Sequence, residues 1–217
     1  MSTKILLTGH RGGLGHAIWD RISRELRDFD MLWGLEIEDK ALQNLREITS
    51  IIVAQGANNP VEPGQSGAGQ AEWDANWSSI IELAQQWVHE KRGQPGRKPF
   101  IVLVSNSAII PRTNSLHYCA SKAAMDMALK VLHRQYAREG FEFYSLCSST
   151  VAQTPMTERI FNEEYLGAAG MQKAMERFPL QRLITKEEVA EWVWFILSTP
   201  AAVLAAGQSL RLDSGEH

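Results

Sequence analysis

The feature that most constrains the fold lies at the start of the chain, where an apolar segment runs directly into a glycine-rich one. Residues 4–8 read Lys-Ile-Leu-Leu-Thr, a pattern typical of a short buried strand, and residues 9–15 contain four glycines. From residue 16 to residue 27 the apolar side chains recur at helical spacing. A strand, a glycine turn and a helix in this order predict the first unit of an α/β fold. Glycines let the backbone turn tightly and approach a pyrophosphate at the N-terminus of the helix.

Strand and helix patterns continue to alternate along the rest of the chain. Buried strands are expected at residues 30–37, 50–54, 100–104 and 141–146. Helices are expected at residues 39–48, 73–92, 118–130 and 185–196, the last opening with a capping box at Thr185 and Glu188. This alternation predicts a parallel sheet covered by helices on both faces. A length of 217 residues suits a single domain, residues 1–217.

The middle of the chain brings together three side chains with a possible chemical use. Tyr118 and Lys122 stand four residues apart at the start of a segment rich in helix formers, so a helix would place them on one face. A phenol titrates near pH 10, and an ammonium held close to it lowers that pKa. Ser105 follows the strand at 100–104, thirteen residues before Tyr118. Its hydroxyl, at the carboxyl end of a strand, could hold a carbonyl or alcohol oxygen beside the tyrosine.

Taken together, these segments resemble the short-chain dehydrogenase/reductase family. The family's Thr-Gly-x-x-x-Gly-x-Gly turn is matched by Thr8, Gly9, Gly13 and Gly15. The spacing from Ser105 to Tyr118 is also the family's usual one. Val151 and Thr154-Pro155-Met156 are similar to its nicotinamide-side loop, and residues 207–215 resemble its closing strand. The resemblance implies a Rossmann-like, doubly wound sheet. Too few residues separate the glycine turn from the strand at 50–54, so the fold is expected to be one strand–helix unit shorter than usual.

The resemblance implies hydride transfer between NAD(P)(H) and an alcohol/ketone pair on a small organic substrate. In the reducing direction Tyr118 would protonate the carbonyl oxygen and Ser105 would polarise the carbonyl. Lys122 would lower the Tyr118 pKa and hydrogen-bond the nicotinamide ribose. The residues expected to hold the cofactor are Thr8, Gly9, Arg11, Gly13, Leu14, Gly15, Glu36, Gln55, Gly56, Tyr118, Lys122, Val151 and Thr154.

Two residues give opposite indications of the cofactor's identity. Glu36 lies 21 residues after Gly15, where a carboxylate can accept a hydrogen bond from the ribose 2′-hydroxyl of NAD and would repel the 2′-phosphate of NADP. Arg11 competes with it, because NADP-preferring relatives often carry a basic residue in this turn. We expect NAD rather than NADP.

Several departures from the family pattern keep a second hypothesis open. Residues 55–59 read Gln-Gly-Ala-Asn-Asn where the family carries Asn-Asn-Ala-Gly, and Ser148-Ser149 replace its Pro-Gly. The family's fourth catalytic group is an asparagine on the helix expected at residues 73–92, where Asn76 is the only asparagine. However, residues 77–84 resemble the family's segment that leads into that asparagine, and this alignment leaves an alanine in its place. The chain could therefore be a nucleotide-binding or regulatory relative that no longer turns over. Dehalogenation by a Ser–Tyr pair ranks third, because it would need an arginine in place of Lys122.

The family also implies a substrate lid, at about residues 155–180, and a homodimer or homotetramer. Composition limits other partners. The net charge of −3, without a basic block, gives nucleic acid or an anionic membrane no electrostatic support. No signal-like or membrane-spanning apolar run is present, and two cysteines fit the reduced thiols of a soluble cytoplasmic protein. The six histidines lack metal-ligand spacing, so no metal site is expected.

Overall fold

A computed structural model describes residues 3–26, 30–35, 44–58, 68–113, 115–164, 172, 175–176 and 178–216. Its strands form one six-stranded, wholly parallel sheet in the order β2-β1-β3-β4-β5-β6. The strands are β1 (Lys4–Thr8), β2 (Met31–Leu35), β3 (Ser50–Val53), β4 (Lys98–Leu103), β5 (Phe141–Ser148) and β6 (Ser209–Leu212). The predicted α/β fold with a parallel sheet is confirmed.

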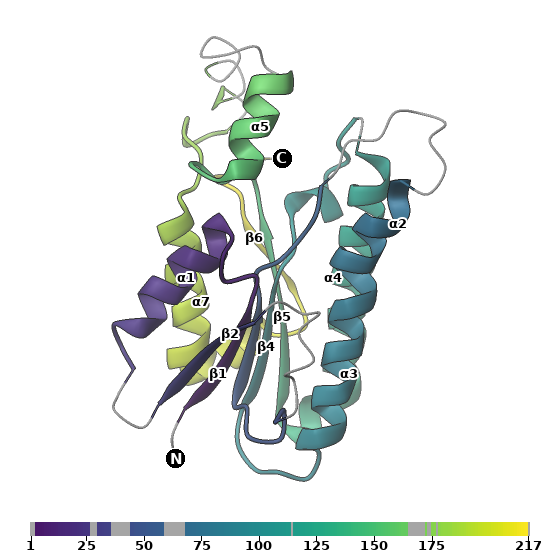
Figure 1. Cartoon of the computed structure of the whole chain (residues 1–217), viewed down its shortest axis with the longest axis vertical. Helices are drawn as coiled ribbons and strands as arrows, with labels where there is room; N and C mark the ends of the chain where they lie inside the picture. Colours follow the sequence, from purple (N-terminus) through teal and green to yellow (C-terminus); the bar gives the residue numbers. More distant parts are fainter. Residues whose placement is uncertain are drawn as a thin grey trace.

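Helices cover both faces of this sheet, as Figure 1 shows. One face carries α1 (Gly13–Ser23) and α7 (Lys186–Ser198), and the other carries α3 (Ser79–Lys91) and α4 (Leu116–Tyr136). The remaining helical segments are α2 (Ala68–Trp73), a π-helical turn η1 (Asp74–Ser78), α5 (Pro155–Glu164) and the 3-10 turns η2 (Asn106–Ala108), η3 (Ala137–Glu139) and η4 (Pro200–Ala205). The sheet is therefore doubly wound, as expected.

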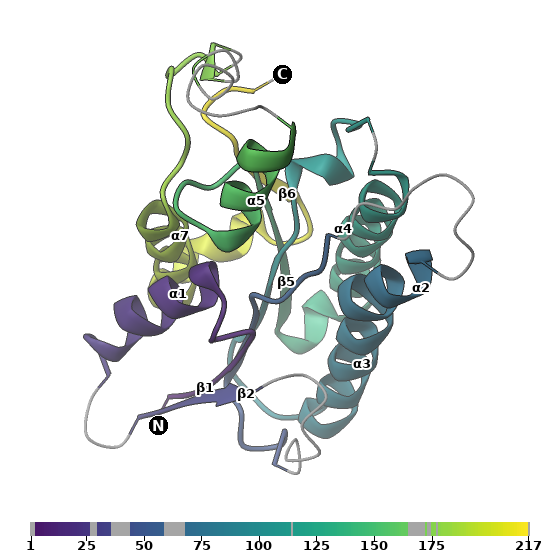
Figure 2. The same ribbon diagram turned by 45° about the horizontal axis from the view of Figure 1, so that its top comes forward.

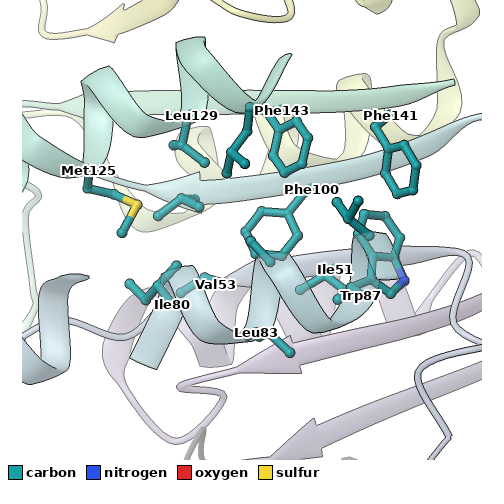
Figure 3. Close-up of a cluster of buried hydrophobic side chains, with 14 of the residues drawn as sticks. Ile51, Val53, Ile80, Leu83, Trp87, Phe100, Met125, Leu129, Phe141 and Phe143 are labelled. Carbon is teal, nitrogen blue, oxygen red and sulfur yellow. The ribbon is translucent and has the colours of Figure 1, made fainter. Parts of the chain in front are cut away.

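The core between the sheet and the α3–α4 layer contains a row of aromatic rings among aliphatic side chains (Figure 3). Trp87 of α3 lies with its ring centroid 5.8 Å from that of Phe100 on β4 and 5.6 Å from that of Phe141 on β5, the second contact edge to face. Phe143 continues the row along β5, with its ring centroid 5.5 Å from that of Phe100. All four side chains are fully buried, and such rings contribute large apolar areas. This explains why residues 100–103 of β4 form a continuous apolar segment, and why Phe141 and Phe143 alternate with polar or tyrosine side chains along β5.

The start of α7 is fixed by the capping box that the sequence predicted. Thr185 Oγ1 accepts a hydrogen bond from the Glu188 backbone N–H at 3.1 Å, and Glu188 Oε2 accepts one from the Thr185 N–H at 2.8 Å. Arg182 donates to the same carboxylate, and together these bonds lower the pKa of Glu188 to about 2. The boundary of this helix is thus encoded locally.

The shortened N-terminal half has a clear place in the sheet. The described part of the chain provides one strand, β2, between β1 and β3. β2 pairs with one side of β1, and β3 pairs with the other. The strand order therefore reverses between β1 and β3, which is where open parallel sheets bind ligands. Of the helix expected at 39–48, residues 44–47 form a turn and residues 39–43 lie outside the described residues.

Candidate active site

A cavity of about 710 Å³ opens at the carboxyl ends of β1, β3, β4 and β5. Its walls come from the glycine turn, the loops after β3, β4 and β5, the first turns of α4, and the start of α5. Figure 2 shows α5 and the last described residues at this same end of the sheet. Of the residues proposed from the sequence, those that line the cavity are Gly13, Leu14, Gln55, Gly56, Ser105, Tyr118, Lys122, Val151 and Thr154.

Two glycines of the turn act by leaving space. Gly9 has a φ of +72°, and a Cβ there would lie 2.6 Å from the backbone nitrogen of Gln55. A Cβ at Gly15 would lie 2.0 Å from the carbonyl oxygen of Gly9. No side chain fits at either position, so these glycines allow β1, the turn and α1 to pack closely.

The other proposed residues of this region lie away from the cavity wall or outside the described chain. Thr8 is fully buried at the end of β1, and Arg11 is exposed on the turn. Neither lines the cavity, and nor do Gly9 and Gly15. Glu36, the carboxylate expected to read the cofactor's ribose, lies outside the described residues.

The cavity-facing residues fit a dinucleotide. Gly12 caps α1 without any side-chain hydrogen bond, which leaves the first N–H groups of the helix available to an anion. A Cβ at Gly13 would lie 3.5 Å from the Thr154 side chain, so the absence of one keeps the passage between turn and loop open. Gln55 Oε1 is buried at the cavity without a hydrogen-bond partner in the described structure. The helix thus supplies N–H donors for an anion, Gly13 keeps space for a ligand beside Thr154, and Gln55 supplies a hydrogen-bond acceptor.

Ser105 is held as a donor at the end of β4. Its Oγ accepts a hydrogen bond from the Ser107 backbone N–H at 3.1 Å, which caps η2. This contact uses an acceptor site of the hydroxyl and leaves its hydrogen free to donate. That donor interacts with the Tyr118 side chain and lowers the pKa of the phenol in part. Ser107 also lines the cavity, but the structure gives it no such contact with Tyr118.

Tyr118 and Lys122 share one face of α4, as predicted, because the helix begins at Leu116. The expected effect on the phenol is different. Burial is the largest influence and raises the pKa of Tyr118, while the interactions with Ser105 and Arg112 lower it in part. The Lys122 Nζ lies over the Tyr118 ring, 5.7 Å from its centroid, and donates a hydrogen bond to the Leu103 carbonyl at 3.4 Å.

Lys122 is itself strongly affected by the protein around it. Its side chain is 3% exposed, and burial lowers its pKa to about 8. A Cβ at Gly56 would lie 2.9 Å from Lys122 Nζ. The glycine therefore leaves the space in which the ammonium reaches the cavity.

Asn76 lies behind the cavity wall, beside Gly56, whereas the alignment of the apolar phrase left alanine in the fourth catalytic place. A catalytic role for Asn76 stays a hypothesis. Asn76 lies in η1 and is fully buried. Its Oδ1 accepts from the Ala57 N–H at 2.9 Å, and its Nδ2 donates to the Ala57 carbonyl at 2.8 Å and to Ser121 Oγ at 3.1 Å. It thus ties the loop after β3 to α4 next to Lys122. Ala84 instead lies within the apolar core. A π-helical turn, often found at functional sites, shifts the helical phase here.

Sequence reasoning missed two charged residues of the cavity wall. Arg112, in the loop before α4, and Glu216, near the end of the chain, form an ion pair there. Their separation in sequence, 104 residues, gave no local signal.

The described part of the expected lid lies against the cavity. Thr154 Oγ1 accepts from the Thr157 N–H at 3.2 Å and caps the start of α5. Met156 and Phe178 line the cavity. Arg159 of α5 donates a hydrogen bond to the carbonyl of Asn58, a residue of the loop after β3 that also lines the cavity. That this segment moves as a lid stays a prediction.

Two other kinds of feature do not occur within the described ranges. Their His, Cys, Asp and Glu side chains form no group of three or more that could hold a metal ion. Among the same residues, no helix combines the length and the apolar character needed to cross a membrane.

Comparison with known proteins places these features in context. A family model described as "Enoyl-(Acyl carrier protein) reductase" matches residues 53–217. An uncharacterised oxidoreductase of Mycobacterium tuberculosis is 27% identical over 188 residues, which cover 83% of this chain and 67% of that protein. An L-xylulose reductase of Caenorhabditis elegans is 32% identical over 111 residues, 51% of this chain and 42% of that protein. A structure of an actinorhodin polyketide ketoreductase variant with NADPH has the same fold, with a TM-score of 0.83 and 17% identity over 99% of this chain and 97% of that one.

Proposed function

This chain belongs to the short-chain dehydrogenase/reductase family, and on that premise we propose that it transfers a hydride between NAD(P)(H) and an alcohol/ketone pair on a small organic substrate. One observation carries the proposal. A single cavity is lined by Ser105, Tyr118 and Lys122 and also by the glycine turn, so a proton donor faces the same space as a dinucleotide cradle. The reaction needs both within reach of one substrate.

The chain offers a holding group for each part of the cofactor. The N-terminus of α1, which has no side-chain cap, would bind the pyrophosphate, and Lys122 would bind the nicotinamide ribose. Val151 and Thr154 would lie on the nicotinamide side, and Gln55 lines the same cavity. When bound, NAD(P)H supplies the hydride, and the protein supplies placement and proton transfer.

Tyr118 acts as the proton donor in this proposal. Because burial raises its pKa, the phenol stays protonated at neutral pH and can give its proton to the oxygen of a ketone. The reverse reaction requires the phenolate, which forms only at higher pH. We therefore expect reduction to be the faster direction at pH 7 and oxidation to gain as the pH rises.

Ser105 and Lys122 prepare the oxygen for that proton. The Ser105 hydroxyl would turn its hydrogen from Tyr118 to the carbonyl oxygen of a bound substrate, stabilising the negative charge that develops there. The Lys122 ammonium, held at the cavity by Leu103, would contribute further positive potential. Asn76 hydrogen-bonds both to the loop after β3 and to α4, and so holds these two segments together beside the ammonium.

The decisive experiment measures binding and turnover separately. Titration with NADH and NADPH, followed by fluorescence, gives the two cofactor affinities, and a panel of ketones and alcohols then gives turnover. Tyr118→Phe should lose turnover but keep its cofactor affinity, since the glycine turn and Lys122 remain. Appreciable activity in that variant would exclude Tyr118 as the donor.

The second candidate function is a relative that binds the nucleotide without turnover. The observation in its favour is that Ser148 and Ser149, which replace the family's Pro-Gly, line the cavity, and Ser149 Oγ is buried without a partner in the described structure. Tight cofactor binding together with no turnover across the ketone panel would select this candidate.

We retain NAD as the proposed cofactor, in a cytoplasmic enzyme, on the basis of Glu36 and the two free cysteines, Cys119 and Cys147. A homodimer or homotetramer is proposed as well. Its support is an exposed apolar strip on α4, formed by Leu116, Met127 and Val131, since monomers seldom expose several large apolar groups on one helix. Light scattering coupled to size exclusion measures the mass of the assembly.

A further inference from the structure

The wall of the cavity contains an ion pair that the proposed reaction does not use. Arg112 Nη2 donates to both carboxylate oxygens of Glu216, at 2.9 and 3.0 Å. Both residues line the cavity that contains Ser105 and Tyr118. Glu216 is only 5% exposed, so its carboxylate is a buried group and not a surface charge that happens to lie near an arginine.

The position of Glu216 is fixed by hydrogen bonds that connect it to the loop after β4, which carries Ser105. Asn106, the residue after Ser105, donates from Nδ2 to Asp213 Oδ2 at 3.1 Å and to Glu216 Oε2 at 3.4 Å. Asp213 is also paired with Arg211. These contacts attach the last described residues to the segment that carries Ser105, and the pair therefore has a defined place relative to the reacting groups.

Arg112 reaches the reacting end of the cavity. It lines the cavity together with Tyr118, and its backbone carbonyl accepts a hydrogen bond from the thiol of Cys119, the residue after Tyr118, at 4.0 Å. The positive charge of Arg112 also lowers the pKa of the Tyr118 phenol in part. A guanidinium has five N–H donors, and Glu216 uses those of Nη2. Within the described structure the remaining donors, on Nε and Nη1, make no other hydrogen bond, so they are available to a ligand.

The charge of this wall decides what kind of ligand suits it. The charged side chains among the described lining residues are Arg112, Lys122 and Glu216, and Lys122 is assigned to the cofactor. The Arg112–Glu216 pair is neutral as a unit. A carboxylate substrate would place a second anion beside Glu216 in a buried site, which is costly. An alkyl group would leave the free donors of Arg112 without partners. A hydroxyl group can accept from Arg112 and donate to Glu216 at the same time.

We infer that Arg112 and Glu216 position a hydroxyl group next to the reacting carbonyl, and that the substrate is a neutral hydroxyketone or the corresponding polyol. This inference rests on the proposed function, because it describes the substrate of the same site. Arg112 and Glu216 are the residues that would set specificity, whereas Tyr118 and Ser105 would act on the reacting oxygen.

Three ketones that differ in one group test the inference. Hydroxyacetone, acetone and pyruvate carry CH₂OH, CH₃ and COO⁻ next to the same methyl ketone. We expect kcat/KM for hydroxyacetone to exceed that for acetone by about tenfold or more, because a site built to bind a hydroxyl discriminates against analogues that lack it. Pyruvate should be the poorest of the three. A wild-type preference for pyruvate or acetone would overturn the inference.

Two variants separate specificity from a general effect on Tyr118. In Glu216→Gln the anion is removed with little change of shape, so kcat/KM for pyruvate should rise relative to that for hydroxyacetone by about tenfold. In Arg112→Gln the preference for hydroxyacetone over acetone should fall. Glu139→Gln, which removes the carboxylate of an exposed pair with Arg92, is the matched control and should leave all ratios unchanged. Equal losses for all three ketones would show that the pair acts only through Tyr118.

A binding measurement keeps the test independent of turnover. Calorimetry of the three ketones with the NAD⁺-loaded wild-type protein should give the tightest binding for hydroxyacetone, and failure of all three to bind would overturn the inference. Hydroxyacetone that binds selectively but is not reduced would overturn the proposed function alone. Indiscriminate reduction of the three would overturn only the assignment of Arg112 and Glu216.

Discussion

Replacing Lys122 with methionine should stabilise the fold at neutral pH while removing its activity. The side chain of Lys122 is 3% exposed, and burial lowers its pKa from 10.5 to about 8. A shift of this size corresponds to about 3 kcal/mol of unfavourable free energy for keeping the charged ammonium in the fold at pH 7. Methionine has a similar length and no charge. Allowing about 1 kcal/mol for the lost hydrogen bond to Leu103, we expect the unfolding free energy to rise by about 2 kcal/mol.

The sign of the pH dependence gives this prediction a second readout. Because the folded chain binds the Lys122 proton less tightly than the unfolded chain does, the unfolded state holds more protons between about pH 8 and pH 10.5. The wild-type protein should gain stability from this residue across that window. The advantage of Lys122→Met should therefore be complete below pH 8 and almost absent near pH 10.5.

Urea unfolding of the wild type and the variant at pH 7 and at pH 10 measures both quantities. Lys186→Met, on the partly exposed first turn of α7, is the matched control and should change stability equally at the two pH values. A variant that is no more stable than the wild type at pH 7, or whose gain does not depend on pH, would refute the assignment of a strained buried ammonium. Stability gained at the cost of function would mark Lys122 as a residue kept for its chemistry.

Three further predictions follow from the site. Ser105→Ala should lower kcat by about 10²-fold, as the loss of a donor to the reacting oxygen does, and Ser107→Ala should have a milder effect; an inverted ranking in steady-state kinetics would assign the donor to Ser107. Gly15→Ala should destabilise the chain by about 1–3 kcal/mol and weaken cofactor binding, because its Cβ would meet the carbonyl of Gly9, whereas Gly12→Ala has room and should be tolerated in thermal unfolding. Wild-type protein should bind NADH more tightly than NADPH; tenfold tighter NADPH binding that Arg11→Ala abolishes would show that Arg11 reads the 2′-phosphate.

The predictions from sequence that were confirmed depend on local pattern. The strand at 100–104, the helix that carries Tyr118 and Lys122, and the capping box at Thr185 each arise from the order of neighbouring residues, which sets backbone geometry directly. The meeting of Ser105 with Tyr118 also followed, because the carboxyl end of a parallel strand is a fixed place in this fold.

The features that escaped prediction depend on three-dimensional context. The apolar phrase did not predict the place of Asn76 behind the cavity wall, because a π-helical turn at Asn76 breaks the regular helical phase that sequence alignment assumes. The pKa of Tyr118 was expected to fall, but the depth of its burial, which outweighs nearby charge, is known only once the chain is folded. Arg112 and Glu216 come into contact only in the folded protein, so no local spacing in the sequence predicts their ion pair.

The place of β2 at the edge of the sheet has a consequence for where the length of the chain can vary. Among the described strands β2 pairs with β1 alone, so a strand–helix unit can be lost on that side without interrupting the run from β1 to β6. No described residue of β2 lines the cavity, so a deletion at that edge of the sheet leaves the cavity wall intact. The edge of the sheet at β2 is thus a region where the length of the chain can differ without a change in the cavity wall, and the family model begins its match at residue 53, after β2.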